Sequence, residues 1–234
     1  MKHPILRIDP VSDETYQVSG LHLERFSDLR IWLFDLEATG LDTSRERITQ
    51  VAGIRIEAGK TIEESAFTEL VFPGEGVEIS KEVQDLTGIR LEMLAEARRL
   101  PEVWNDCVKA AADCDLWMGQ SVFEYDVPLL ETEFARNGMP SELPPILDSV
   151  VLATSVLGMP ALRWSTNALI QRFEVDVKGL RRHDALDDVR ILGRILGPIT
   201  KLIKEEQGDQ LRIGLESPLE IKRHPPIKPE AAAD

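Results

Sequence analysis

The 234-residue chain has only two cysteines and no long hydrophobic run. Cys107 and Cys114 lie seven positions apart in an expected helix, about 10 Å from each other, which excludes a disulfide between them and indicates buried thiols. No stretch reaches the roughly 18–20 apolar residues that span a bilayer, because the nearest, residues 150–162, is interrupted by Gly158 and Pro160. The N-terminus also lacks the apolar core of a signal peptide, so we expect a cytoplasmic protein with no membrane partner.

Basic side chains are scarce relative to acidic ones: 27 Lys and Arg stand against 41 Asp and Glu, a net charge of −14. Phosphate backbones are bound by positive surfaces, so this balance excludes a protein that coats nucleic acid by bulk electrostatics. It does not exclude an enzyme that reaches phosphates through bound metal ions. The 43% of apolar residues can build a sizeable core, which excludes disorder throughout the chain.

Hydrophobic patterns divide the chain into three parts. Residues 1–28 form an N-terminal extension of unknown structure. Residues 29–206 begin with three strand patterns and continue with helical spacing around one further short apolar segment, which predicts a single α/β domain. The last residues contain four prolines and an alanine-rich end, so we predict an extended or disordered tail over 207–234.

Two acids follow directly on the apolar run IWLF at residues 31–34. Asp35 and Glu37 occupy alternate strand positions, so their side chains point the same way, about 6–7 Å apart. An unpaired carboxylate at the end of a buried strand costs several kcal/mol, and a divalent cation would compensate this charge. Thr39 and Gly40 then supply a free hydroxyl and an unhindered backbone for a ligand. Taken alone, the motif also fits a solvated sheet edge.

The segment HDALDDV at 183–189 is a second candidate site. If His183 and Asp188 were both helical they would point about 140° apart, so they share a site only if His183 lies in the preceding loop. The alternative gives the acids ordinary helix-start roles, with Asp184 as the N-cap and Asp188 as a first-turn charge favoured by the helix dipole.

The third candidate segment contains Asp126, which precedes Pro128 at the expected start of another helix. Capping that helix is its simplest role. Glu124 is the rival acid in the same segment, but on neighbouring alternation it points away from Asp126. We therefore favour Asp126 as the functional residue.

These three segments resemble the three motifs of the DEDDh (DnaQ-like) 3′-5′ exonucleases, a family that includes the proofreading subunit of bacterial DNA polymerase III, ribonuclease T and oligoribonuclease. The segments are FDLEATGL at 34–41, YDVPLL at 125–130 and HDALDD at 183–188. Their order and spacing match over nearly all of the expected domain. The resemblance implies a ribonuclease-H-like fold, in which helices flank a mixed β-sheet.

The resemblance also implies hydrolysis of the 3′-terminal phosphodiester with two divalent ions, Mg²⁺ or Mn²⁺, whose preferred ligands are hard carboxylate oxygens. Asp35 would bridge the two ions. Glu37 and Asp188 would complete the site on the side of the attacking water, and Asp126 would hold the second ion. His183 would be the general base, because a neutral imidazole near pH 7 can accept a proton from water.

Substrate contacts follow from the same resemblance. Thr39, Gly40 and Leu41 would meet the 3′-terminal nucleotide, with backbone N–H groups on the sugar or phosphate and Leu41 against the base. The pair Gln120-Ser121 departs from the His-Asn that many members carry, and one extra residue precedes Tyr125, which alters how the strand could be held.

Basic residues are concentrated between positions 163 and 183, a segment with five basic and two acidic residues in a chain whose net charge is negative. They are Arg163, Arg172, Lys178, Arg181 and Arg182. The cluster fits a phosphate-facing rim and fits a solvated surface equally well.

The favoured function is therefore a 3′-5′ exonuclease acting on single-stranded DNA. The same chemistry on RNA or short oligoribonucleotides is the alternative, because no element of the sequence selects between 2′-OH and 2′-H. A catalytically inactive nucleic-acid-binding or scaffold module is the third possibility, although such a module has no need for a buried cluster of like charges. The flanking segments could tether the domain to a polymerase or a helicase, or serve solubility alone.

Overall fold

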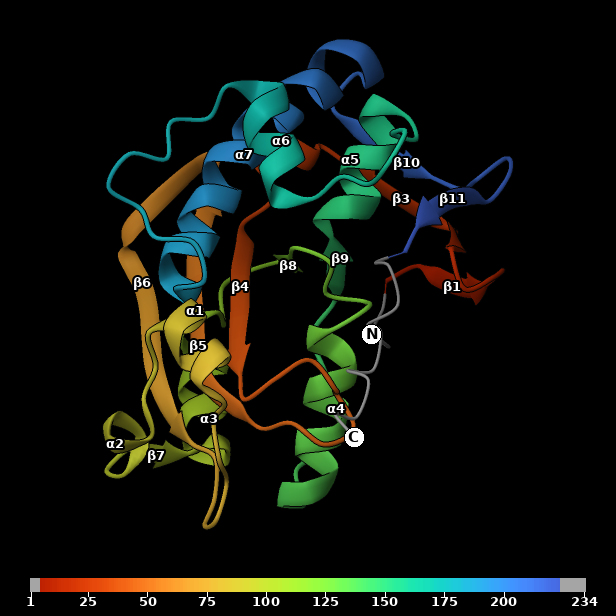
Figure 1. Cartoon of the computed structure of the whole chain (residues 1–234). Coiled ribbons are helices and arrows are strands. Elements are labelled where there is room, and N and C mark those ends of the chain that lie inside the picture. Colours follow the sequence, from red (N-terminus) through yellow and green to blue (C-terminus); the bar gives the residue numbers. More distant parts are fainter. Residues whose placement is uncertain (1–4, 224–234) are drawn as a thin grey trace.

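A six-stranded mixed sheet runs through the centre of the computed structural model, which describes residues 5–223 (Figure 1). Its strands, in spatial order, are β7 (Arg98–Arg99), β6 (Lys60–Phe72), β5 (Ile48–Glu57), β4 (Ile31–Ala38), β8 (Leu116–Gly119) and β9 (Ile146–Asp148). Strands β4, β5 and β6 are antiparallel, whereas β8 and β9 continue the sheet in parallel from β4. Ala58 and Gly59, both at positive φ, form the tight β5–β6 turn.

Strand β4 is buried on both faces, which explains its continuous apolar run. Ile31 and Leu33 join one hydrophobic cluster, while Trp32 and Phe34 join the cluster on the opposite face. All four side chains are at most 2% exposed. Gly53 on the neighbouring strand leaves room for the Trp32 indole, because a Cβ there would lie 2.4 Å from the ring. The strand therefore fixes the sheet between two cores before it reaches its acidic end.

Helices cover both faces of the sheet, as the sequence predicted. The cluster on the first face includes α5 (Ser149–Leu157), α6 (Thr166–Phe173) and α7 (Ala185–Gln207). The cluster on the second face includes α3 (Leu100–Ala110) and α4 (Asp126–Asn137). Two short helices, α1 (Lys81–Thr87) and α2 (Leu91–Leu94), lie near β6 (Figure 1). The expected α/β class, a mixed sheet flanked by helices, is confirmed.

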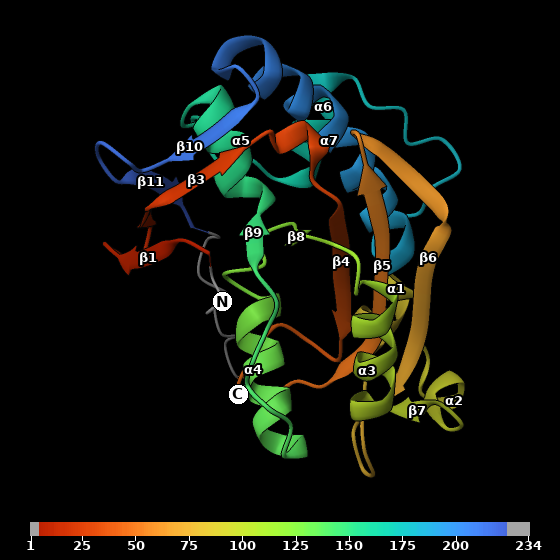
Figure 2. The same cartoon turned by 180° about the vertical axis from the view of Figure 1, so that it is seen from behind.

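Segments 7–24 and 210–222, near opposite ends of the described chain, pair with each other, which the sequence patterns did not indicate (Figure 2). Strand β11 (Leu219–Lys222) joins β2 (Thr15–Ser19), and β2 in turn pairs with β1 (Arg7–Pro10). Strand β10 (Gln210–Ile213) pairs with β3 (Leu21–Glu24), which precedes the short 3₁₀ helix η1 (Phe26–Asp28).

These flanking strands share the first hydrophobic cluster of the domain. Tyr16, Val18 and Ile221 are at most 2% exposed and belong to the same core as α7. Ordered strands thus occupy part of the segment that we expected to be an extended or disordered tail, and residues 224–234 of that tail lie outside the described residues. The boundaries at 29 and 206 stay a prediction.

Both cysteines are free thiols, as expected from their spacing: Cys107 is buried and Cys114 is partly buried. Burial raises the pKa of the Cys107 thiol to about 12, so it is protonated at neutral pH. Within residues 5–223, no helix combines the length and apolar character that a membrane crossing requires.

Candidate active site

A cavity of about 730 Å³ opens where β4 ends and α7 begins. Its wall includes Asp35, Glu37, Asp126, His183 and Asp188, so the three sequence motifs meet in one place. They come from the end of β4, the first residue of α4, the loop before α7 and the first turns of α7. All four acids and the histidine that the sequence selected therefore line a common cavity.

Three of these acids lie close enough to share a cation. Carboxylate oxygens of Asp35, Glu37 and Asp188 are all within 4.8 Å of one another. The first two point to the same side because they alternate along β4. Asp188 reaches them from α7, whose N-cap is Asp184; the Asp184 carboxylate accepts the backbone N–H of Asp187 at 3.1 Å. Capping is thus done by Asp184 and not by Asp188, which lines the cavity.

Burial opposes the ionisation of Asp35 and Glu37. The pKa of Asp35 is raised well above its ordinary value, first by burial and then by repulsion from Glu37 and Asp126. Burial and the charge of Asp184 raise the pKa of Glu37 to about 7, while Arg182 acts in the opposite direction. A group of hard oxygen ligands with this excess of negative charge suits a divalent cation.

Arg182 supplies part of the missing positive charge. Its guanidinium pairs with the Asp188 carboxylate, and its charge also opposes the raised pKa values of Asp35 and Glu37. The side chain is one-third exposed and lines the cavity. Arg163 also lines the cavity, so two of the five basic residues in the 163–183 cluster lie on its wall.

Asp126 lies beside the three-acid group rather than within it. It is 4% exposed, and burial raises its pKa to about 8, with further upward contributions from Asp148 and Glu37. Helix α4 begins at Asp126 itself, and no side chain caps its N-terminus, so capping does not account for this acid. The rival Glu124 also lines the cavity, where it pairs with Arg163 at 3.1 Å.

His183 occupies the loop before α7, as the shared-site hypothesis requires. Its φ of 62° is unusual for a residue other than glycine, and its backbone N–H donates to Asp188 Oδ2 at 3.0 Å. Burial, followed by the charges of Arg182 and Arg181, lowers the pKa of the imidazole below its ordinary value. The ring is therefore neutral at pH 7 and able to accept a proton.

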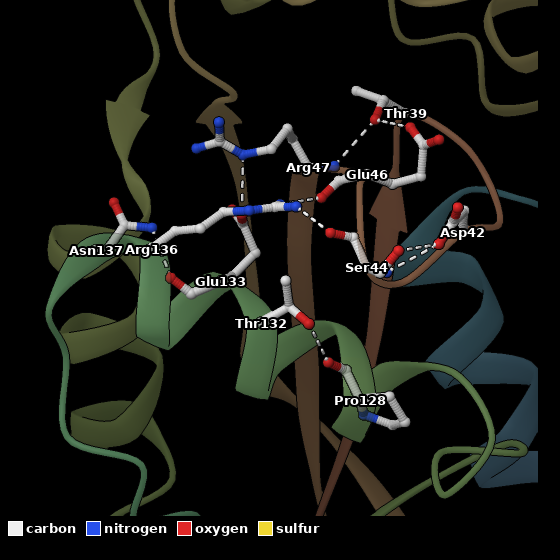
Figure 3. A network of polar contacts seen from close by, with 10 residues as sticks. All are labelled: Thr39, Asp42, Ser44, Glu46, Arg47, Pro128, Thr132, Glu133, Arg136 and Asn137. Carbon is white, nitrogen blue, oxygen red and sulfur yellow. Dashed lines mark hydrogen bonds and ion pairs between the residues drawn. The ribbon is translucent and has the colours of Figure 1, made fainter.

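The residues expected to meet a terminal nucleotide differ in their placement. Gly40 and Leu41 line the cavity, and Leu41 is 62% exposed. The Thr39 side chain is turned into the protein: its hydroxyl donates to Glu46 and accepts the backbone N–H of Arg47 at 3.0 Å (Figure 3). The expectation of a free hydroxyl at Thr39 was wrong, because the hydroxyl donates a hydrogen bond to the Glu46 carboxylate.

The segment with the unusual Gln120-Ser121 pair is held by side chains from two other elements. Gln120 Nε2 donates to the Trp164 carbonyl at 2.9 Å and Gln120 Oε1 accepts from the Ser149 hydroxyl. Asp148 accepts the backbone N–H groups of Ser121 at 3.0 Å and Phe123 at 3.2 Å. Asp148 therefore orders this segment as a buried hydrogen-bond acceptor.

A mixed sheet that brings four acids and a histidine to one cavity suits one class of enzymes, the metal-assisted hydrolases. Comparison with known proteins narrows this class. Residues 32–196 match the RNase_T family model, described as Exonuclease, and this range holds all four acids and the histidine. The match covers well over half of the chain, so the protein belongs to the RNase_T, or DnaQ-like, exonuclease family.

Two groups of relatives are similar in sequence. The DNA polymerase III PolC-type of Streptococcus sanguinis (strain SK36) is 29% identical over 182 residues, which are 78% of this chain and 12% of that protein. The DNA polymerase III subunit epsilon of Rickettsia prowazekii (strain Madrid E) is 28% identical over 216 residues, which are 87% of this chain and 91% of that protein. The chain thus spans a small part of the PolC-type relatives and nearly all of the epsilon subunit.

Solved structures with the same fold include proteins bound to different nucleic acids. Exonuclease X in complex with 5′ overhanging duplex DNA has a TM-score of 0.55 at 20% identity, covering 73% of this chain and 91% of that one. The 3′-exonuclease in a structure of histone mRNA stem-loop recognition has a TM-score of 0.64 at 16% identity, covering 79% and 85%. At these identities the likeness establishes the fold alone.

Proposed function

We propose that this protein is a 3′-5′ exonuclease that removes nucleotides from single-stranded DNA with two divalent cations, Mg²⁺ or Mn²⁺. The observation that carries the proposal is the meeting of three carboxylates within 4.8 Å of one another with Asp126 and His183 in one cavity. Two cations would balance the charge of the four acids, because burial otherwise opposes the ionisation of Asp35, Glu37 and Asp126.

The acids divide between the two ions by their positions. Asp35 is central, since both Glu37 and Asp126 raise its pKa, so it would bridge the ions. Glu37 and Asp188 would complete the site of the first ion, and Asp126 would hold the second. When bound, such ions stabilise the attacking and the leaving oxygens of a phosphodiester and lower the pKa of the attacking water.

His183 would act as the general base. As the water oxygen bonds to the terminal phosphorus, a ring nitrogen of His183 accepts a water proton, and the P–O3′ bond breaks. The O3′ atom of the shortened strand then takes a proton from solvent, and the product is a nucleoside 5′-monophosphate. The lowered pKa of His183 keeps the imidazole neutral and ready for this step.

Gly40 and Leu41 would bind the terminal nucleotide. Leu41 presents an exposed apolar side chain to the cavity, where it could cover the face of a base. The backbone at Gly40 would approach the sugar or the phosphate. Thr39 would contribute through its place in the loop, because its hydroxyl and its N–H are both engaged within the protein.

DNA is the proposed substrate because the sequence relatives are DNA polymerase III chains. RNA is the alternative, supported by the fold shared with the 3′-exonuclease that recognises histone mRNA. Association with a DNA polymerase is also part of the proposal and rests on the names of the relatives. A helicase partner has no such support.

The test uses 5′-labelled DNA and RNA strands of matched sequence, incubated with the protein and Mg²⁺ or Mn²⁺. We expect a ladder that shortens from the 3′ end, faster for DNA, and its loss in Asp35→Ala. Faster shortening of RNA would assign the substrate to the alternative. No metal-dependent shortening of either strand would refute the proposed activity and favour an inactive binding module.

A further inference from the structure

The β4–β5 loop, residues 39–47, carries Gly40 and Leu41 to the cavity and returns along α4 (Figure 3). Glu133 and Arg136 lie on the part of α4 that faces this loop, two to three turns after the metal-ligand candidate Asp126. Neither Glu133 nor Arg136 lines the cavity. They therefore do not line the nucleotide site that we propose, whereas they do contact the loop that reaches it.

Arg136 joins α4 to the backbone of the loop. Its Nη2 donates to the Ser44 carbonyl at 2.6 Å and its Nη1 donates to the Glu46 carbonyl at 2.5 Å. The planar guanidinium offers several N–H groups in a fixed arrangement, so a single side chain can hold two carbonyls at once. A lysine has one nitrogen and cannot reproduce this arrangement.

Glu133, one turn earlier on α4, orients the Arg136 guanidinium. Its carboxylate accepts from Arg136 Nη1 and from Arg47 Nε, each at 2.8 Å, and its side chain is 2% exposed. Charge-assisted hydrogen bonds shielded from water are stronger and less screened than surface pairs. The acid thus ties one loop residue, Arg47, and one helix residue, Arg136, to the same point.

The start of the loop is held from the other end of the helix. The Tyr125 hydroxyl, one residue before α4, donates to the Gly40 carbonyl. The Glu46 side chain bonds to Thr39 and crosses over Gly40, where an added Cβ would lie 2.9 Å from Glu46 Cδ. Both ends of the loop are therefore fastened to the helix that presents Asp126.

We propose that Glu133 and Arg136 are positioning residues, which hold the β4–β5 loop so that Gly40 and Leu41 meet the 3′-terminal nucleotide beside Asp126. This proposal rests on the proposed function, because it assigns the loop to nucleotide binding. A loop fastened before the substrate arrives needs no ordering during binding, and so the network lowers KM for substrates that carry a terminal base.

The test compares Arg136→Ala with Arg136→Lys and with the control Arg98→Ala. Arg98 is a suitable control because it pairs with Asp106 at 2.7 Å and with Glu69 at 3.4 Å outside the cavity. KM and kcat are measured on a single strand with an ordinary 3′ nucleotide and on the same strand with an abasic 3′ residue. A general loss of protein stability would change the kinetic constants for both substrates alike.

We expect Arg136→Ala to raise KM about 10-fold on the ordinary strand, to leave kcat within about 2-fold, and to change KM little on the abasic strand. Arg136→Lys should fall between wild type and Arg136→Ala, and Arg98→Ala should match wild type. Combining Arg136→Ala with Leu41→Ala should add little to either change, since both act on one contact. The proposal would be overturned if KM rose equally on the two strands, or if the rises in KM were additive in the double variant.

Hydrogen exchange keeps the two proposals distinguishable. The backbone N–H groups of Thr39 and Arg47 are bonded within the loop, so Arg136→Ala should speed their exchange. If wild type hydrolyses DNA while the variant alters neither exchange nor KM, the positioning proposal alone fails. If wild type hydrolyses neither nucleic acid, the proposed activity is refuted. In that case the positioning role is tested by binding of a nucleoside 5′-monophosphate, and unchanged affinity in Arg136→Ala would refute that role as well.

Discussion

Replacing Asp126 with asparagine should stabilise the metal-free protein while it abolishes activity. Burial raises the pKa of Asp126 to about 8, against 3.8 for an exposed aspartate. A raised pKa of this kind contributes stability that is fully present below the unfolded-state pKa and is lost as the pH rises through the folded-state pKa. At pH 7.5 the unfolded chain carries a hydrated carboxylate, whereas the folded protein must protonate Asp126 or bury its charge.

The size of the effect follows from the pKa difference. One pKa unit corresponds to about 1.4 kcal/mol, so the interval from 3.8 to pH 7.5 bounds the cost at roughly 5 kcal/mol. Asp35 and Glu37 share the same repulsion and readjust when one acid is removed. We therefore expect Asp126→Asn to gain about 1–3 kcal/mol of unfolding free energy in a chelator.

The assay is urea unfolding of both proteins between pH 5 and 8, with EDTA or with saturating Mn²⁺. In EDTA the advantage of Asp126→Asn should grow as the pH rises. Mn²⁺ should stabilise wild type more than the variant, because the bound cations remove the repulsion that the substitution removes permanently. A variant that is less stable than wild type in EDTA across this range would refute the reasoning.

Three further outcomes are expected. His183→Ala should retain Mn²⁺ binding by calorimetry and lose about 10²–10⁴-fold in turnover, and unchanged hydrolysis would remove the general-base role. Arg182→Gln should bind Mn²⁺ several-fold more tightly, because the Arg182 guanidinium competes with cations for the acids, and weaker Mn²⁺ binding would contradict this. In EDTA the variant should lose about 1 kcal/mol of stability, because the guanidinium offsets the negative charge of the acids. Gly53→Ala should lower the unfolding free energy by about 1–3 kcal/mol in urea titrations, since its Cβ would overlap the Trp32 indole, and a neutral effect would show that the ring can move.

The sheet centre and the acidic end of β4 could be predicted because their signals are local. Four apolar residues in succession required two covered faces, and both faces are covered. The alternation of Asp35 and Glu37 predicted that they point to one side, and the helical angle meant that His183 could share a site with Asp188 only from a loop. Each of these inferences depends on the geometry of a few neighbouring residues.

Partners distant in the sequence could not be predicted in this way. Tyr16 pairs in register with Ile221, and no periodicity within either segment selects the other. The hydroxyl of Thr39 was expected to be free because a turn exposes such groups, yet the returning loop brings Glu46 to it. The sequence also did not indicate that Glu133 is buried, because an acid in a helix is usually exposed and nothing in the helix pattern indicates that Arg47 lies beside it.

The proposed reaction is hydrolysis at the 3′ end by attack of water on the terminal phosphodiester. The most direct measurement follows a single-stranded DNA in H₂¹⁸O with Mn²⁺ and determines by mass spectrometry which product carries the label. We expect nucleoside 5′-monophosphates with one ¹⁸O on phosphorus and a shortened strand that ends in an unlabelled 3′-hydroxyl. Label on a 3′-phosphate of the shortened strand, or release of mononucleotides from the 5′ end, would contradict it.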